Sequence, residues 1–200
     1  MRMDRYEKRK KKFNIIMTVV VGFLMVASIF AFVLFDTGQT TSSMTYNSKT
    51  FTTTNSGYRT KISGKYMDFY YFPSELERIN LDPSIISMVK NSQGIAFVFD
   101  PNDNTTDDLT YIDTIRYDLQ TQMDKPTYFG ISGNSPNYNL PIISCENSTA
   151  IVPFFIINIS TETSFNLSQK YPYCVTMNGK LKDILALKDR LVYTYYGIMS

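Results

Sequence analysis

The two cysteines, Cys145 and Cys174, are the residues of this 200-residue chain whose chemistry is easiest to test. Cys145 is either a nucleophile or one half of a disulfide beside the sequon at Asn147. A nucleophilic cysteine needs a base, commonly histidine, and the chain contains no histidine. A disulfide across these 29 residues would stabilise the fold by roughly 3.5 kcal/mol. Two unpaired buried cysteines are the remaining alternative, and the compartment decides between them.

An acidic loop, DPNDNTTDD at residues 100–108, follows a strongly apolar run. Ligands of open α/β sheets bind at the carboxyl ends of strands, where this loop is expected. Its carboxylate and amide oxygens suit Ca²⁺, the one cofactor the sequence suggests. The candidate ligands are Asp100, Asn102, Asp103 and Asn104.

The same loop departs from the EF-hand pattern. Thr105 stands where position six requires glycine, and Tyr111 stands where position twelve requires glutamate. The alternative is a polar loop without a cation, in which Thr106 or Asp107 caps the next helix.

Recognisable catalytic motifs are missing from the rest of the sequence. Serine hydrolases need a histidine base and a G-x-S-x-G elbow, and phosphate sites need a glycine-rich loop; the sequence has none of these. Without histidine, no zinc site is expected either. A carboxylate-based hydrolase using acids such as Asp100 and Asp103 stays open, but the sequence favours a non-enzymatic role.

Four N-x-S/T sequons make N-glycosylation a further candidate chemistry. Asn158 lies in an apolar run and is expected to be buried. The candidate acceptors are therefore Asn104, Asn147 and Asn166.

The apolar segment at residues 13–35 is expected to be a transmembrane helix. Its 21 residues from Ile15 to Phe35 carry no charge, and a helix of that length spans roughly 31 Å, which matches a bilayer core. A cleavable signal peptide has a shorter apolar core and ends in small residues, whereas this segment ends in FAFVLF. We therefore expect an uncleaved anchor, with the lipid bilayer as its partner.

Charge predicts the orientation of that anchor. Residues 1–12 carry seven basic and two acidic groups, whereas the rest of the chain carries 13 basic and 16 acidic groups. The positive-inside rule places the basic tip in the cytoplasm and the C-terminal domain outside the plasma membrane. A basic run beside a membrane span is a topology signal, so no nucleic-acid partner is expected. The oxidising exterior favours the disulfide.

The remaining chain predicts an α/β fold. A Ser/Thr-rich stalk at residues 36–45 leads into an extracytoplasmic domain at 46–200. Three β-prone runs joined by glycine turns predict a β-meander. A mixed sheet with about three to four helices packed on it follows, because strand and helix patterns alternate. The two strands that flank the helix at 107–123 are expected to be parallel.

Two features of the predicted helices concern their ends and faces. Ser74 and Glu77 fit a capping box, and Asp82 fits the N-cap of a helix that begins with Pro83. The last helix, in LKDILALKDRLVYTYYG, reads as amphipathic with Gly197 past its end. Aromatic clusters such as DFYYF are either a binding surface or part of the core.

Four motifs between residues 45 and 200 occur in a recognisable order: FYYFPSELE, FDPN followed by IDTIRYDL, PIISCENST, and DRLVYTYYGIM. This order resembles that of uncharacterised small archaeal proteins from nanosized lineages. The resemblance implies a membrane anchor, an exported α/β domain and paired cysteines at Cys145 and Cys174. That group has no known activity, so the resemblance assigns no catalytic residue.

The sequence as a whole predicts a single-pass membrane protein with a non-enzymatic binding or assembly module at the cell surface. Its partner outside the cell would be a protein or a glycan. The alternatives are the carboxylate-based hydrolase and an accessory subunit of a membrane complex.

Overall fold

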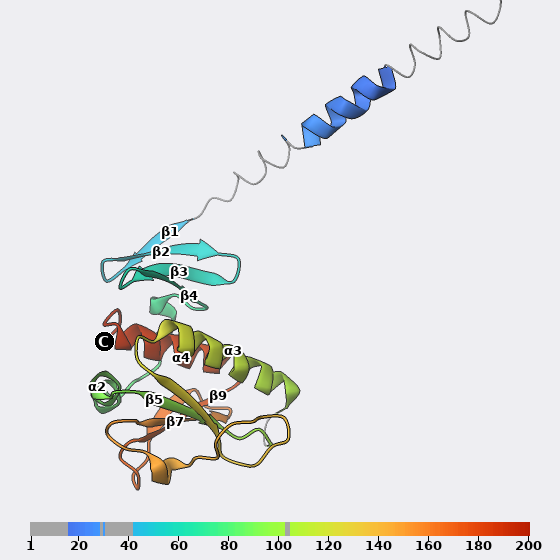
Figure 1. Cartoon of the computed structure of the whole chain (residues 1–200). Helices are drawn as coiled ribbons and strands as arrows, with labels where there is room; N and C mark the ends of the chain where they lie inside the picture. The colour runs from blue at the N-terminus through green and yellow to red at the C-terminus, as the bar shows by residue number, and fades with distance from the viewer. Residues whose placement is uncertain (1–15, 29, 31–41, 103–104) are drawn as a thin grey trace, which may run out of the picture. The chain divides into compact units, whose positions relative to one another are not determined.

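The computed structural model describes residues 16–28, 30, 42–102 and 105–200, and it divides the chain into the units Met1–Thr41 and Ser42–Ser200 (Figure 1). In the first unit, residues 16–28 and 30 are helical, and large apolar side chains such as Phe23 and Met25 are exposed. No helix within the described ranges has the length and apolarity that a bilayer crossing requires. The predicted basic tip and residues 36–41 of the predicted stalk lie outside the described residues.

The second unit opens with the predicted meander, a four-stranded antiparallel sheet in the order β1-β2-β3-β4. Its first strand begins inside the segment predicted as stalk, so the folded domain starts a few residues earlier than expected. One face of the sheet is apolar and buried, because alternate side chains along a strand point the same way. The strands are β1 (Ser43–Tyr46), β2 (Lys49–Thr54), β3 (Gly57–Ile62) and β4 (Lys65–Phe69).

Two short helical segments, η1 (Pro73–Leu76) and α2 (Pro83–Asn91), follow the meander. The predicted cap of α2 is confirmed, because the Asp82 carboxylate accepts the Ser84 N–H at 2.7 Å. The predicted capping box of Ser74 and Glu77 is wrong. Proline is favoured at the first position of a helix, so η1 begins at Pro73. The carboxylate that caps it is Glu75, two residues earlier than the predicted Glu77.

A five-stranded sheet in the order β6-β5-β7-β9-β8 forms the second half of the domain, and only β8 runs antiparallel to its neighbour. The predicted parallel pair is confirmed as β5 and β6, joined by α3 (Thr106–Gln122). All five residues of β5 are buried, as expected for a central strand covered on both faces. The strands are β5 (Ile95–Phe99), β6 (Thr127–Ile131), β7 (Phe154–Ile159), β8 (Ser164–Leu167) and β9 (Cys174–Gly179).

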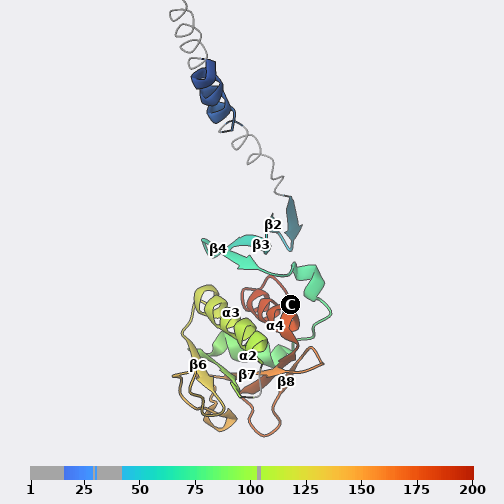
Figure 2. The same ribbon diagram turned by 90° about the vertical axis from the view of Figure 1, so that its right-hand side faces the viewer.

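Helices α3 and α4 (Leu181–Tyr195) lie between the two sheets of this unit (Figures 1 and 2). The predicted last helix is present as α4, with its apolar side chains at helical spacing, but it is buried on all sides from Ile184 to Thr194 instead of on one face. The sheets cover α4 from above and below, and α3, α2 and η1 pack beside it, so it has no solvent-facing side. Three consecutive charged residues of α4 are therefore inside the protein: Lys188, Asp189 and Arg190.

The other face of the five-stranded sheet is covered by an extended segment, residues 132–153, which contains the short helix η2 (Cys145–Asn147). Partly buried Ile143 and Val152 from this segment pack on Ala96 and Phe154 of the sheet. The domain is therefore layered in the order meander, helices, sheet and covering segment.

Candidate functional site

The disulfide predicted between Cys145 and Cys174 is present, with an S–S bond of 2.04 Å. Cys174 is the first residue of β9 and is fully buried, whereas Cys145 belongs to η2. The bond fastens the covering segment to the sheet. Because both sulfurs are engaged, neither cysteine is a nucleophile in this state.

The acidic loop lies at the carboxyl end of β5, as predicted. Its residues Asp100 and Asn102 form hydrogen bonds with each other and with the loop that follows β6. The Asp100 carboxylate accepts the Asn102 N–H at 2.9 Å and the Ser132 hydroxyl at 3.0 Å. The Asn102 amide donates to the Asn134 carbonyl at 3.1 Å. These contacts join the loops that follow β5 and β6.

The other two candidate cation ligands, Asp103 and Asn104, lie outside the described residues. Within the described part, no group of three or more Asp, Glu, His or Cys side chains could hold a metal ion. The N-cap of α3 is neither of the residues predicted, because Thr105 caps it and forms a capping box with Asp108.

The sequons fall at different places in the fold. Asn147 in η2 and Asn166 in β8 are exposed, as N-glycosylation requires, and Asn104 lies outside the described residues. The expectation that Asn158 is buried is wrong. Its side chain faces away from the helices, where its amide donates to the Asn178 side chain at 2.7 Å.

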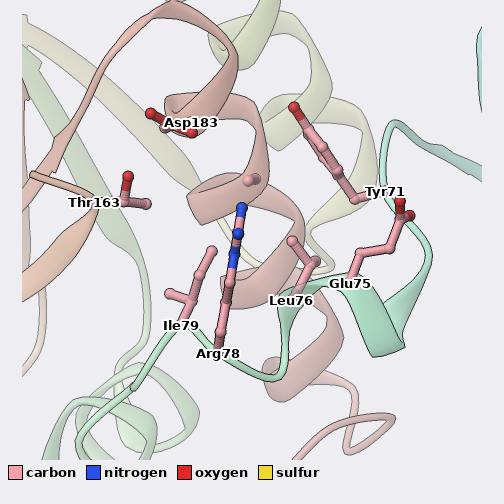
Figure 3. Close-up of a pocket in the computed structure, with 8 residues that line it drawn as sticks. Tyr71, Glu75, Leu76, Arg78, Ile79, Thr163 and Asp183 are labelled. Atoms are coloured by element: carbon pink, nitrogen blue, oxygen red, sulfur yellow. The ribbon is translucent and has the colours of Figure 1, made fainter. Parts of the chain in front are cut away.

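A polar pocket of about 310 Å³ lies where η1 and the turn after it meet the start of α4 (Figure 3). Arg78 extends into it between Glu75 on one side and Thr163 on the other, and Asp183 lies beyond its guanidinium. Glu75 is already engaged, because its carboxylate accepts the Phe72 N–H at 2.6 Å. The pocket therefore combines one cation with two carboxylates, and one of these carboxylates also caps η1.

A buried ion cluster joins α4 to α3 and to the end of the meander. Lys188 Nζ lies 2.6 Å from Asp189 Oδ1 and 3.1 Å from Asp118 Oδ2, and it donates to Gln122 Oε1 at 3.3 Å. Its ammonium also sits over the Tyr70 ring at 5.0 Å. Three oxygens and two rings, those of Tyr70 and Phe69, surround this ammonium, which leaves no space for a substrate.

The second carboxylate oxygen of Asp189 receives the backbone N–H groups of Tyr70 at 2.7 Å and Tyr71 at 3.0 Å. Burial raises the pKa of Asp189, and the neighbouring Lys188 opposes that rise. Burial and the nearby carboxylates of Asp118 and Asp189 raise the pKa of Tyr70 to about 12. The cluster fixes the position of the meander on α4.

The aromatic stretch DFYYF belongs largely to the same junction. Phe69 stacks on Tyr193 of α4 with ring centroids 4.1 Å apart, and the Tyr193 hydroxyl donates to the Tyr71 carbonyl at 2.9 Å. Of the two readings that the sequence left open, core packing accounts for these residues.

An uncharged groove of about 430 Å³ borders β8, which is an edge strand of the five-stranded sheet. One wall is a face of α2 formed by Ser84, Ser87, Met88 and Asn91, spaced so that they share one side of the helix. Leu167 at the end of β8 and Tyr173 before β9 line the other wall. More than a third of each of these two side chains is exposed.

The sequence did not reveal the groove, the polar pocket or the ion cluster. Each combines segments that are far apart in the chain, such as Ser84 with Leu167 or Asp118 with Lys188. The uncharged stretch SFNLS was the one local signal for an edge strand near residue 165. No family model, curated protein or solved structure matches this chain, so its function has to be inferred from its own residues.

Proposed function

We infer that the protein is a single-pass membrane protein whose domain at 42–200 lies outside the cytoplasm and serves as a non-enzymatic binding or assembly module. The observation that carries this proposal is the Cys145–Cys174 disulfide in a domain that follows an apolar helix and a basic tip. Disulfides persist in oxidising compartments. The anchor of residues 13–35 delivers the domain to such a compartment.

Two further observations support binding rather than catalysis. The charges of the buried cluster, Lys188, Asp189 and Asp118, are paired with one another and leave no room for a substrate. The groove beside β8, in contrast, presents partly exposed Leu167 and Tyr173 without a charged residue in its lining. A partner that buries these apolar side chains would gain from the hydrophobic effect.

Thiol labelling of intact cells that express the full chain tests the topology. The Tyr66→Cys variant places a thiol on a side chain of the meander that is 73% exposed, and a membrane-impermeant maleimide should label it from outside. The matched Lys10→Cys variant in the basic tip should react only after the cells are lysed. Labelling of Lys10→Cys in intact cells, with protection of Tyr66→Cys, would reverse the proposed orientation.

Carbonate extraction tests the anchor itself. The full chain should stay with the membrane pellet, whereas Met25→Arg should be released or fail to insert. A charge at the centre of a transmembrane helix costs about 2.5 to 3.5 kcal/mol on insertion scales. Met25→Leu is the control and should behave like the unchanged chain. Equal retention of the arginine variant would argue against a membrane span at residues 13–35.

A second candidate function, a carboxylate-based hydrolase, is favoured by one observation. The polar pocket is lined by two acids, Glu75 and Asp183, as a carboxylate-based hydrolase requires. Hydrolysis of chromogenic glycosides that Asp183→Asn abolishes, but the exposed-residue control Asp107→Asn preserves, would establish this function in place of the binding module.

A further inference from the structure

Within the part of the chain that the structure describes, the backbone groups on the outer edge of β8 have no strand as a neighbour, and they recur in a regular pattern. In its antiparallel ladder with β9, the partners are Ser164 with Asn178 through to Leu167 with Val175, and the Ser168 N–H continues the ladder to the Cys174 carbonyl at 2.9 Å. Residues of such a ladder alternate between those that bond the neighbouring strand and those that point away from it. Phe165 and Leu167 therefore direct their N–H and C=O groups to the outside.

This edge is complementary to itself. A two-fold axis through Asn166 would place Phe165 of one copy opposite Leu167 of the other, and Leu167 opposite Phe165. Each of these two pairs exchanges an N–H and a C=O, so that all the outward groups find partners. Asn166 would then face Asn166 of the second copy on the side of the sheet away from the helices.

The absence of charge on β8 favours a second copy of the chain as the partner of this edge. A second copy always brings the same charges, so a charged edge repels itself, and natural edge strands use charged residues for this purpose. β8 carries no charged residue, and neither does the face of α2 that borders it. Two copies can approach through this edge without repulsion between like charges.

The groove supplies the apolar surface that such a contact would bury. Opposed residues of an antiparallel pair share one face of the sheet, and Leu167 stands opposite Val175, which belongs to the core on the helix side. Leu167 of each copy would therefore meet Phe165 of the other beside the groove, where Met88 and Tyr173 lie. Burial of partly exposed apolar side chains drives association.

The remaining sheet edges do not combine free backbone groups, an absence of charge and a bordering apolar groove. At β4 the Gln122 side chain already donates to the Asp68 carbonyl at 2.6 Å, and at β6 the bridge between Ile131 and Ile142 covers the end of the strand. β1 is uncharged, but its residues Ser43, Met44 and Thr45 are exposed and border neither pocket described above. β1 therefore offers a matched control.

We propose that the domain self-associates through β8, which pairs antiparallel with β8 of a second copy about a two-fold axis at Asn166 and joins the two five-stranded sheets into one. This inference rests on the proposed function as an assembly module and names its partner as the chain itself. A common membrane would bring two anchored copies together at high local concentration. Asn166 is also a sequon residue, so a glycan there would block the pairing.

Cysteine cross-linking of the full chain in detergent micelles tests the register. Asn166→Cys places two thiols opposite each other on the axis, within the reach of a disulfide. Mild oxidation should therefore convert most of the chain to a covalent dimer. Met44→Cys, which holds the equivalent place in β1, should stay monomeric. Cross-linking that is absent at Asn166→Cys, or equal at both positions, overturns the proposal.

A charge variant distinguishes this contact from association through the anchor. Leu167→Lys should reduce the cross-linked yield of Asn166→Cys at least tenfold. By light scattering, the Leu167→Lys variant should be a monomer, with half the protein mass of the dimer that the unchanged chain forms. Thr45→Lys should change neither result. A dimer that survives Leu167→Lys overturns the β8 contact. Because the micelle assay does not depend on sidedness, it can succeed or fail separately from the labelling that tests membrane topology.

Discussion

At the scale of single residues, the feature with the largest energetic consequence is Lys188. Transfer of an ammonium and two carboxylates from water to the interior is costly, and their mutual attraction offsets that cost only when the geometry is close. Here the Nζ to carboxylate distances are 2.6 and 3.1 Å, and Lys188 is fully buried. Removal of the cation should therefore change the free energy of unfolding by more than the intact cluster contributes to it.

Replacement of Lys188 by methionine should lower the free energy of unfolding by about 3 to 5 kcal/mol, because it leaves two carboxylates buried without their cation. Urea denaturation of the domain at 42–200, followed by circular dichroism, measures this. The control Lys65→Met removes an exposed lysine and should change the free energy by less than about 0.5 kcal/mol. Similar losses in the two variants would mean that the cluster is not a stabilising unit.

The raised pKa of Tyr70 predicts that the domain loses stability at high pH. Burial and the adjacent carboxylates raise the pKa of Tyr70 from 10.0 to about 12. The unfolded chain therefore ionises first, and the contribution to stability is full below pH 10 and declines as the pH rises toward 12. Urea midpoints measured across this window should fall, and the fall should be shallower in Tyr70→Phe. If the urea midpoint of Tyr70→Phe fell with pH as steeply as that of the unchanged domain, another group would be responsible for the loss of stability.

At the scale of elements, the meander depends on the glycine that begins β3. Gly57 has a φ of +147°, and a Cβ atom there would lie 2.1 Å from the Phe69 carbonyl oxygen of β4. Gly64, in the turn between β3 and β4, has a φ of +85° but no atom near its Cβ position. The two glycines thus separate steric overlap from backbone preference.

Gly64→Ala should cost about 1 kcal/mol of folding free energy through its backbone conformation alone. Gly57→Ala should cost clearly more, roughly 2 to 4 kcal/mol, because β4 must also move away. Thermal unfolding of the two variants under the same conditions gives the comparison. Equal melting temperatures would show that β4 yields to the extra methyl group without strain.

Local sequence signals predicted the elements that local forces determine. The cap at Asp82, the apolar run of β5 and the pattern of α3 were readable because each lies within about one helical turn or one strand. β8 was not predicted, because SFNL is short and alternates without a strong apolar signal. The full burial of α4 was not predicted either, because it requires a second sheet that the helix sequence does not encode.

The candidate sites divide in the same way. The cysteine pair was predictable, since a chain with two thiols and no histidine allows few alternatives. The groove was not, because the face at Ser84 and Met88 meets Leu167 only after folding. Contacts between residues some 80 positions apart depend on the whole topology, which no local pattern contains.

At the scale of the whole molecule, the disulfide holds the covering segment on the five-stranded sheet. The double variant Cys145→Ala/Cys174→Ala should lose roughly 3.5 kcal/mol, the loop-closure term for 29 residues. Hydrogen exchange of the backbone amides of residues 132–153 should increase far more than that of α4. The wild-type domain treated with dithiothreitol should reproduce both changes, and a variant with unaltered exchange would show that packing alone holds the segment.

The central position of α4 also has a consequence for biosynthesis. This helix is the last element in chain order, yet both sheets pack against it. While the nascent polypeptide leaves the ribosome, each sheet exposes the part of its apolar face that α4 covers until the residues up to Tyr195 have emerged. The thiols at positions 145 and 174 emerge earlier, so in the proposed extracytoplasmic compartment they can oxidise before the core closes. Chaperones in that compartment would therefore encounter an oxidised, half-open intermediate that becomes native only when translation supplies α4.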